Sequence, residues 1–332
     1  MILDILLNVL FLIVGFVFLI KGADFFIVSS SSIARKFNVS PLVIGLTLVA
    51  FGTSLPELAV SVAASISAKQ AGTTADIAMG NVIGSNIANI TLILGLSAVM
   101  MPIAVRKSMN RQEFPFLLLT AILIAIFGFA FADQTIVWWE ALILLGFFAY
   151  YMRLMFKSPE QHVSEEDIKV IDVKKAILIL IVGLAGVTIG GALVTRGAEF
   201  IATEILKNFM TATKATTLVG LSVVALGTSL PELVTSVLAA KKGENEIALG
   251  NIVGSNVFNT LLIVGFAGII TPLKMNDDVL MDMILVILIT GIMIFFSITK
   301  QTISKREGWI LFGIYVLYIT FIILRALGVF TL

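Results

Sequence analysis

One long pattern occurs twice in this chain of 332 residues. The stretch FGTSLPELAVS at 51–61 is matched by LGTSLPELVTS at 226–236, an offset of 175 residues. GNVIGSNIANI from Gly80 is matched by GNIVGSNVFNT from Gly250 at an offset of 170, because the intervening loop is five residues shorter in the second copy. Two motifs that recur in the same order, with one difference in loop length between them, indicate an internal duplication.

The duplicated unit is strongly apolar. Of all residues 59% are hydrophobic and 13% are charged, and several stretches of roughly 17 or more residues are long enough to cross a bilayer. The absence of cysteine excludes disulfides and thiolate chemistry. We therefore predict an all-α polytopic membrane protein in a lipid bilayer, with no nucleic-acid partner. Its ten transmembrane helices are expected at 2–34, 41–68, 75–101, 113–132, 135–156, 174–206, 216–241, 245–271, 279–299 and 307–327.

The longest polar break divides these segments into five and five. Because five is odd, the second copy must enter the membrane from the opposite side, which is the inverted-repeat layout of secondary transporters. We predict a first repeat at 1–156, a linker at 157–173 and a second, inverted repeat at 174–332. If the linker is cytoplasmic, most Lys and Arg residues fall inside, so both termini are expected outside the cell (plasma) membrane.

Each repeat carries one glutamate inside an apolar segment. Glu57 is the only charged residue in 37–68, and Glu232 is the only one in 215–240. A charged side chain near the bilayer centre costs roughly 2.5–3.5 kcal/mol on insertion scales. A protonated or paired structural glutamate is the alternative, but no Lys or Arg lies near the centre of either segment. A bound cation is the more natural partner.

The GTSLP sequence before each glutamate predicts a broken helix. Pro56 and Pro231 lack an N–H group, which frees a carbonyl one turn earlier, near Gly52 and Gly227. Free carbonyls at membrane depth are tolerated inside protein or at a cavity, where they can coordinate cations. A simple proline kink is the alternative, but it does not require a neighbouring glutamate. Hydroxyl oxygens come from Thr53, Ser54, Thr228 and Ser229.

The GNxxGSN segments add a polar helix face to each repeat. The positions i, i+4 and i+8 hold Asn81, Ser85 and Asn89 in the first repeat, and Asn251, Ser255 and Asn259 in the second. For Asn81 and Asn251, packing and ion contact remain equally open; the other four are expected nearer the ions. Carboxylate, amide, hydroxyl and carbonyl oxygens suit Ca²⁺ or Na⁺. Two carboxylates balance one Ca²⁺ or roughly two Na⁺, which favours an antiporter.

These motifs, in an inverted five-plus-five chain, resemble the sodium/calcium exchangers of the cation/Ca²⁺ antiporter superfamily, in a prokaryotic-type form without a regulatory domain. The resemblance implies that Glu57 and Glu232, with the backbone carbonyls of Thr53 and Thr228, hold Ca²⁺. It places Asn89 and Asn259 at the centre, and it implies that the first and sixth helices slide to alternate access. Flanking Na⁺ sites would use the carbonyls of Ala50 and Ala225 and the hydroxyls of Ser54, Ser85, Ser229 and Ser255.

One position departs from the family pattern. Many sodium/calcium exchangers have Asp where this chain has Asn259, so the site here has two acidic groups rather than three. We predict Na⁺/Ca²⁺ antiport by a monomer without a cofactor, and H⁺/Ca²⁺ antiport through the same glutamates is the alternative. A channel would lack counter-ion coupling, and a hydrolase is disfavoured because Ser54 and Ser229 lack a His or Lys partner. We also expect local ion pairs between Lys21 and Asp24, and between their counterparts Arg196 and Glu199.

Overall fold

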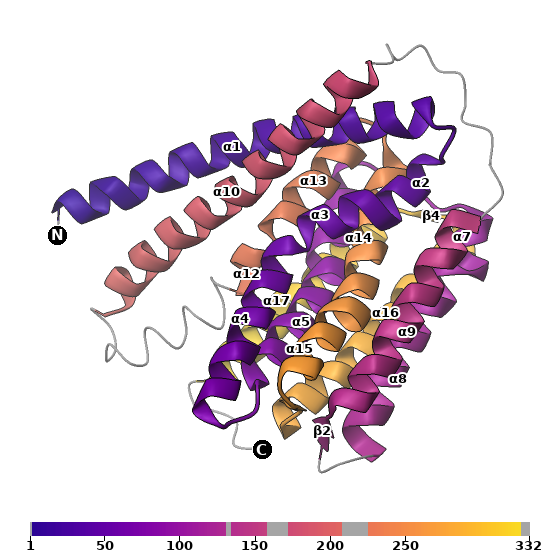
Figure 1. Cartoon of the computed structure of the whole chain (residues 1–332). Coiled ribbons are helices and arrows are strands. Elements are labelled where there is room, and N and C mark those ends of the chain that lie inside the picture. The colour runs from indigo at the N-terminus through magenta and orange to yellow at the C-terminus, as the bar shows by residue number, and fades with distance from the viewer. Residues whose placement is uncertain (1, 131–133, 158–171, 208–224, 327–332) are drawn as a thin grey trace.

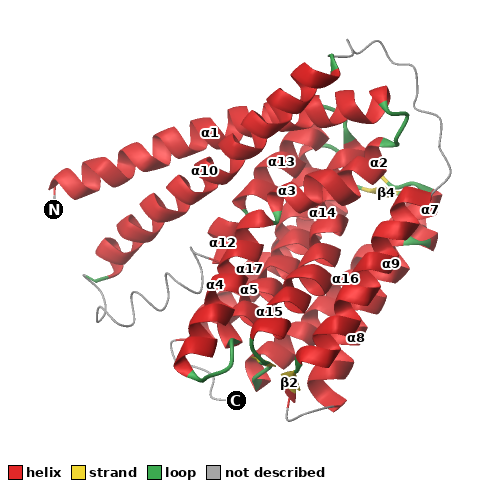
Figure 2. Ribbon diagram, in the orientation of Figure 1, coloured by secondary structure: helices red, strands yellow, loops and turns green. Residues whose placement is uncertain are grey.

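The computed structural model describes residues 2–130, 134–157, 172–207 and 225–326, and these lie almost entirely in helices (Figures 1 and 2). The first half contains α1 (Ile2–Lys36), α2 (Pro41–Ile44), the π-helical turn η1 (Gly45–Val49), α3 (Ala50–Thr53), α4 (Leu55–Ala71), α5 (Asp76–Ala88), the π-helical turn η2 (Asn89–Ile93), α6 (Leu94–Met100), α7 (Lys107–Arg111), α8 (Glu113–Ala130) and α9 (Trp138–Lys157). The second half contains α10 (Val173–Leu206), α12 (Ala225–Thr228), α13 (Leu230–Lys241), α14 (Asn245–Val257), the π-helical turn η5 (Phe258–Ile263), α15 (Val264–Ile270), α16 (Asp277–Lys300) and α17 (Lys305–Ala326).

The helices confirm the polytopic membrane fold. Within the described residues, eight helices are long and apolar enough to cross a membrane, and a ninth span is formed by the bent pair 41–53 and 55–71. The tenth expected segment, 216–241, is described only from Ala225 onward. The ten-helix inverted repeat fits this arrangement. The linker at 157–173 lies almost wholly outside the described residues, and the exact limits of the two repeats stay a prediction.

Helices α1 and α10, the first helix of each half, form a long pair that leans out from the remaining bundle (Figure 1). Glycines allow their backbones to touch. A Cβ on Gly22 would lie 2.6 Å from the backbone nitrogen of Val187, and one on Gly190 would lie 2.6 Å from that of Leu19. Real Cβ atoms do not come so close to backbone atoms, so these positions require glycine. The close contact joins the two helices along their length.

The two halves interlock through reciprocal contacts. Strand β1 (Ile103–Ala104) pairs antiparallel with β4 (Thr302–Ile303), and β2 (Thr135–Ile136) pairs antiparallel with β3 (Leu273–Lys274). Each pair joins one strand from each half. Helix packing also joins the two halves: α9 of the first half packs against α15, and α17 of the second half packs against α6. The resulting apolar core mixes residues of both halves, and α14 is almost completely buried inside it.

Candidate functional site

Each half has a helix break directly before its glutamate. Ser54 separates α3 from α4 with φ −83° and ψ 4°, and Ser229 separates α12 from α13 with φ −88° and ψ 4°. A proline follows two residues later in each case, where the missing N–H group is tolerated in the first helical turn. The first break bends the span by 46°. The predicted broken helices are therefore present in both halves.

The breaks bring the two glutamates together in the protein interior. Glu57 and Glu232 are each only 1% exposed. Ser229 donates a hydrogen bond of 3.2 Å to Oε1 of Glu57, and Ser54 donates one of 3.0 Å to Oε1 of Glu232. Each carboxylate is thus oriented by the serine at the opposite helix break.

Several polar atoms of the two carboxylates and of α5, η2, α14 and η5 are buried without a hydrogen-bond partner. They include the second carboxylate oxygen, Oε2, of both glutamates. Buried polar atoms are normally paired, so these unpaired atoms indicate that something else satisfies them. They also include Oγ of Ser85 and of Ser255, Oδ1 of Asn86, Asn89 and Asn256, and both Oδ1 and Nδ2 of Asn259.

These unpaired groups lie on the helices that cross beside the breaks. Asn89 begins the π-helical turn η2, and Asn259 lies within the matching turn η5. A π-helical turn inserts one extra residue into a helix and is frequent at functional sites. Ser255 lies beside the carboxyl group of Glu232. The structure thus places α14 directly against the broken helices.

The motif asparagines Asn81 and Asn251 bond to protein groups. Asn251 donates a hydrogen bond of 2.9 Å to Ser236 and accepts one of 2.9 Å from the Thr53 hydroxyl. Asn81 donates a hydrogen bond of 3.0 Å to Ser61 and accepts one of 3.4 Å from the Thr228 hydroxyl. These contacts favour the packing interpretation that the sequence left open.

Ser61 and Ser236, which accept hydrogen bonds from Asn81 and Asn251, are further candidate site residues that the sequence interpretation missed. Each stands four residues after its glutamate, at matching places in the two repeats, and each is fully buried. That spacing places them on the same helix face as Glu57 and Glu232, so their position in the pattern could have identified them.

The expected carbonyl ligands lie at the same breaks. Ala50 begins α3 and is completely buried, and its carbonyl accepts the Ser54 N–H at 3.0 Å. Thr53 ends α3, and in the second half Ala225 and Thr228 begin and end α12.

The acidic content of the site is low. Among the described residues, no group of three or more His, Cys, Asp or Glu side chains could hold a metal ion. Hydroxyl, amide and carbonyl oxygens around two carboxylates match the preference of hard cations such as Ca²⁺ and Na⁺.

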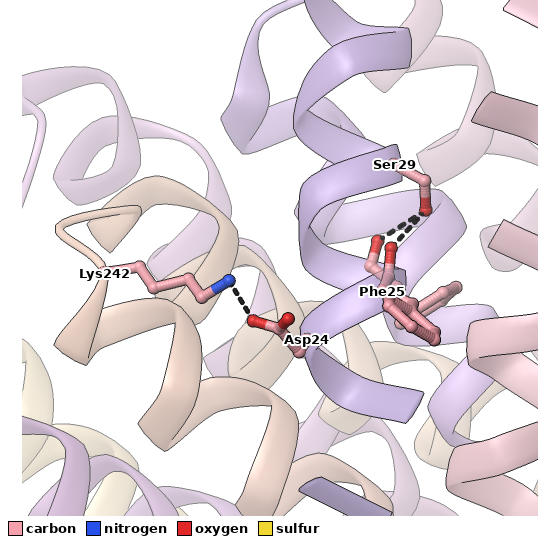
Figure 3. Close-up of polar contacts among 5 residues, drawn as sticks. Asp24, Phe25, Ser29 and Lys242 are labelled. Atoms are coloured by element: carbon pink, nitrogen blue, oxygen red, sulfur yellow. Dashed lines mark hydrogen bonds and ion pairs between the residues drawn. The ribbon is translucent and has the colours of Figure 1, made fainter. Parts of the chain in front are cut away.

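The expected local ion pair on α1 is wrong. Asp24 pairs with Lys242, which directly follows α13 in the other half, and not with Lys21 (Figure 3). On α10, the guanidinium of Arg196 lies 5.3 Å from the ring centre of Phe11, in a cation–π contact. Spacing along one helix favours a local ion pair. In the folded chain, however, Asp24 and Arg196 each contact a residue of another segment instead.

A bundle of membrane helices, with a duplicated break around buried carboxylates, defines the class of secondary transporters rather than enzymes. The family model "Sodium/calcium exchanger protein" matches residues 7–157 and 175–324. The chain belongs to this family.

Similar proteins agree with that assignment. The sodium/calcium exchanger MaX1 of Methanosarcina acetivorans is 34% identical, with 94% of this chain and 97% of the relative covered. The putative antiporter CaxA of Alkalimonas amylolytica is 38% identical, with 80% and 82% covered. A solved structure of the sodium-calcium exchanger NCX_Mj superimposes with a TM-score of 0.81 at 32% identity, with 95% of this chain and 98% of that chain covered. Ca²⁺ and Na⁺ as transported ions are consistent with this family.

Proposed function

We propose that this protein is an antiporter that uses the inward Na⁺ gradient to expel Ca²⁺ through alternating access. The observation that carries this proposal is the pair of buried carboxylates, Glu57 and Glu232, each with one oxygen bonded across the halves and one oxygen unpaired. A charge buried without a partner is costly, so the unpaired oxygens favour bound cations.

The proposed ligands are those that the likeness to the sodium/calcium exchangers implies. We assign Ca²⁺ to the two carboxylates together with the carbonyls of Thr53 and Thr228. Flanking Na⁺ ions are assigned to the carbonyls of Ala50 and Ala225 with the hydroxyls of Ser54, Ser85, Ser229 and Ser255. Asn89 and Asn259 supply amide oxygens between them. The unpaired atoms of Ser85, Ser255, Asn89 and Asn259 support this assignment.

Charge balance determines how many Na⁺ ions exchange for one Ca²⁺. Two carboxylates are neutralised by one Ca²⁺ or by two Na⁺, so either load removes the cost of the buried charges. A site that is neutral with either cargo can cross between the two access states with either one. With no third acidic group at Asn259, we propose two Na⁺ for one Ca²⁺.

The second candidate is H⁺/Ca²⁺ antiport. It is favoured by Asn259, because a site with only two carboxylates can also be neutralised by two protons. Against it stand the four hydroxyls and two alanine carbonyls beside the carboxylates, which suit a metal cation and are not needed to hold a proton. The names of the relatives include both a sodium/calcium exchanger and a putative antiporter.

Ion flux into proteoliposomes separates the two candidates. We expect Ca²⁺ uptake when the vesicles are loaded with Na⁺ and diluted into Na⁺-free buffer at equal pH. A pH gradient without Na⁺ should drive little uptake. Uptake that follows the pH gradient and ignores Na⁺ would reject Na⁺ coupling in favour of the second candidate.

We further propose a cell-membrane location with both termini outside and the linker 157–173 in the cytoplasm. The excess of Lys and Arg in the loops on the linker's side supports this orientation. We also propose that one chain is sufficient for transport, with 1–156 and 174–332 as the two repeats. Ser54 and Glu232 come from opposite halves of one chain, so the site needs no second copy.

A further inference from the structure

Three acceptors surround the hydroxyl of Thr53, and the carboxylate of Glu232 lies near it as well. Oγ1 of Thr53 lies 2.9 Å from Oδ1 of Asn251, 3.2 Å from the carbonyl oxygen of Val49 and 3.4 Å from that of Ala50. A hydroxyl has a single proton, so it serves one of these well at a time. Threonine in a helix usually donates to the carbonyl three or four residues earlier. Here the shortest contact goes to the asparagine of the other half instead.

A serine fixes the orientation of this asparagine. Nδ2 of Asn251 donates to Oγ of Ser236 at 2.9 Å, which leaves Oδ1 facing Thr53. All three side chains are 0% exposed, so water does not compete for these bonds. The amide is therefore a fixed acceptor for the Thr53 proton.

The matching contact in the other half supports this orientation. Asn81 donates through Nδ2 to the backbone carbonyl of Glu57 at 3.4 Å, and a carbonyl oxygen can only accept. Oδ1 of Asn81 must then face Thr228, whose hydroxyl lies 3.4 Å away. The same donor order thus holds in both copies of the motif.

The carbonyl of Ala50 shows why the position of the proton matters. This oxygen already accepts the N–H of Ser54 at 3.0 Å, so one lone pair remains. If Thr53 donated to it, that lone pair would no longer be available to a cation. With the Thr53 proton held by Asn251, the Ala50 carbonyl stays free.

We propose that Asn251 and Ser236 are a positioning pair that holds the Thr53 hydroxyl away from the backbone, so that the Ala50 carbonyl keeps a lone pair for Na⁺. Neither residue touches the ion. The inference rests on the proposed Na⁺ coupling and adds residues that set the Na⁺ affinity. Asn81 and Ser61 form the corresponding pair for Thr228.

Displacement of ⁴⁵Ca²⁺ from the purified full-length protein by Na⁺ tests this proposal. In Asn251→Ala the Thr53 hydroxyl is free to donate to the backbone carbonyls. The Na⁺ concentration at half-displacement should then rise roughly fivefold, which corresponds to the net free energy of one hydrogen bond. Ca²⁺ binding without Na⁺ should change much less, because the carboxylates are intact. Ser236→Ala removes only the anchor of the amide, and should raise the Na⁺ midpoint in the same direction by a smaller factor.

The double variant Asn251→Ala/Thr53→Val separates positioning from mere packing. Valine keeps the shape and the backbone carbonyl of threonine but has no hydroxyl to occupy the Ala50 oxygen. The Na⁺ midpoint should therefore return toward the wild-type value. A purely structural role for Asn251 predicts a further loss instead.

Asn110 provides a matched control. It accepts a hydrogen bond of 2.6 Å from the hydroxyl of Ser297 in the other half, so Asn110→Ala loses the same kind of bond on α7, which carries none of the proposed ligands. Its Na⁺ midpoint should equal that of the wild type. An unchanged midpoint in Asn251→Ala, or no recovery in the double variant, would overturn the positioning role. If Na⁺ fails to displace Ca²⁺ even from the wild type, the proposed function itself is wrong.

Discussion

The hydroxyl of Ser54 donates a 3.0 Å hydrogen bond to the carboxylate of Glu232, 178 residues away in the other half of the chain. The inverted copy of this bond joins Ser229 to Glu57. Each helix break therefore supplies both a carboxylate and the donor that orients the opposite carboxylate. Neither repeat can complete the site without the other.

The first prediction concerns the two carboxylates. Glu57→Gln and Glu232→Gln each remove one of two negative charges while keeping the shape of the side chain. Loss of one partner of a buried charge interaction costs about 3 kcal/mol or more, so Ca²⁺ affinity should fall by a factor of order 100. Ca²⁺ binding and Ca²⁺ flux measure the loss.

Glu199→Gln is the control for this charge removal. Glu199 lies on α10, is exposed and has no assigned ion contact. This variant should keep the exchange rate of the wild type. Full exchange in both Glu57→Gln and Glu232→Gln would refute the site assignment.

The second prediction concerns the serines at the breaks. Ser54→Ala and Ser229→Ala each remove a donor to a carboxylate and a proposed Na⁺ ligand. A hydrogen bond to a charged group contributes about 1.5 kcal/mol or more, so the Na⁺ needed for half-maximal exchange should rise roughly tenfold. The Na⁺ dependence of Ca²⁺ flux measures this shift.

Ser29 offers a buried control serine outside the site. Its hydroxyl donates 2.7 Å to the carbonyl of Phe25 and 3.1 Å to that of Phe26 within the same helix (Figure 3). Ser29→Ala should leave the Na⁺ dependence as it is. An equal shift in Ser29→Ala and Ser54→Ala would indicate a general effect of packing.

The third prediction concerns the number of charges. With two carboxylates, exchange of two Na⁺ for one Ca²⁺ moves no net charge, so the rate should not depend on membrane potential. Asn259→Asp adds a third carboxylate and should introduce a dependence on potential, because a third positive charge is needed for neutrality. Flux at potentials set by K⁺ and valinomycin measures this. A wild-type rate that already depends strongly on potential would contradict the charge balance.

Much of the fold could be predicted from the sequence because membrane crossing requires long apolar segments. The segment expected at 245–271 corresponds to Asn245–Val257, η5 and α15, which end at Ile270. The break before Glu57 was also predictable, since proline cannot donate to the preceding turn. These features depend on local chemistry.

Contacts between distant segments were harder to predict. The pairing of Asp24 with Lys242 depends on how α1 lies against α13, and the sequence around Asp24 contains only its local neighbour Lys21. The contacts of Asn251 with Ser236 and Thr53, on which its proposed positioning role rests, join segments that are far apart in the sequence. Helix packing decides both cases.

The fourth prediction tests orientation. The chain has no cysteine, so a single introduced cysteine is the only thiol. Thr73→Cys, in the exposed turn after α4, should react with a membrane-impermeant maleimide in intact cells, and Lys241→Cys, at the end of α13, should react only after permeabilisation. The opposite pattern would place the termini inside.

The central claim is that Na⁺ and Ca²⁺ compete for one cage around Glu57 and Glu232. Equilibrium binding of ⁴⁵Ca²⁺ to the purified protein, titrated with Na⁺ at constant pH, tests it most directly. We predict complete displacement with a dependence on about the second power of Na⁺ concentration, as two carboxylates require, and no saturable Ca²⁺ binding in the double variant Glu57→Gln/Glu232→Gln. Ca²⁺ that stays bound at every Na⁺ concentration but is released by acid would contradict the claim.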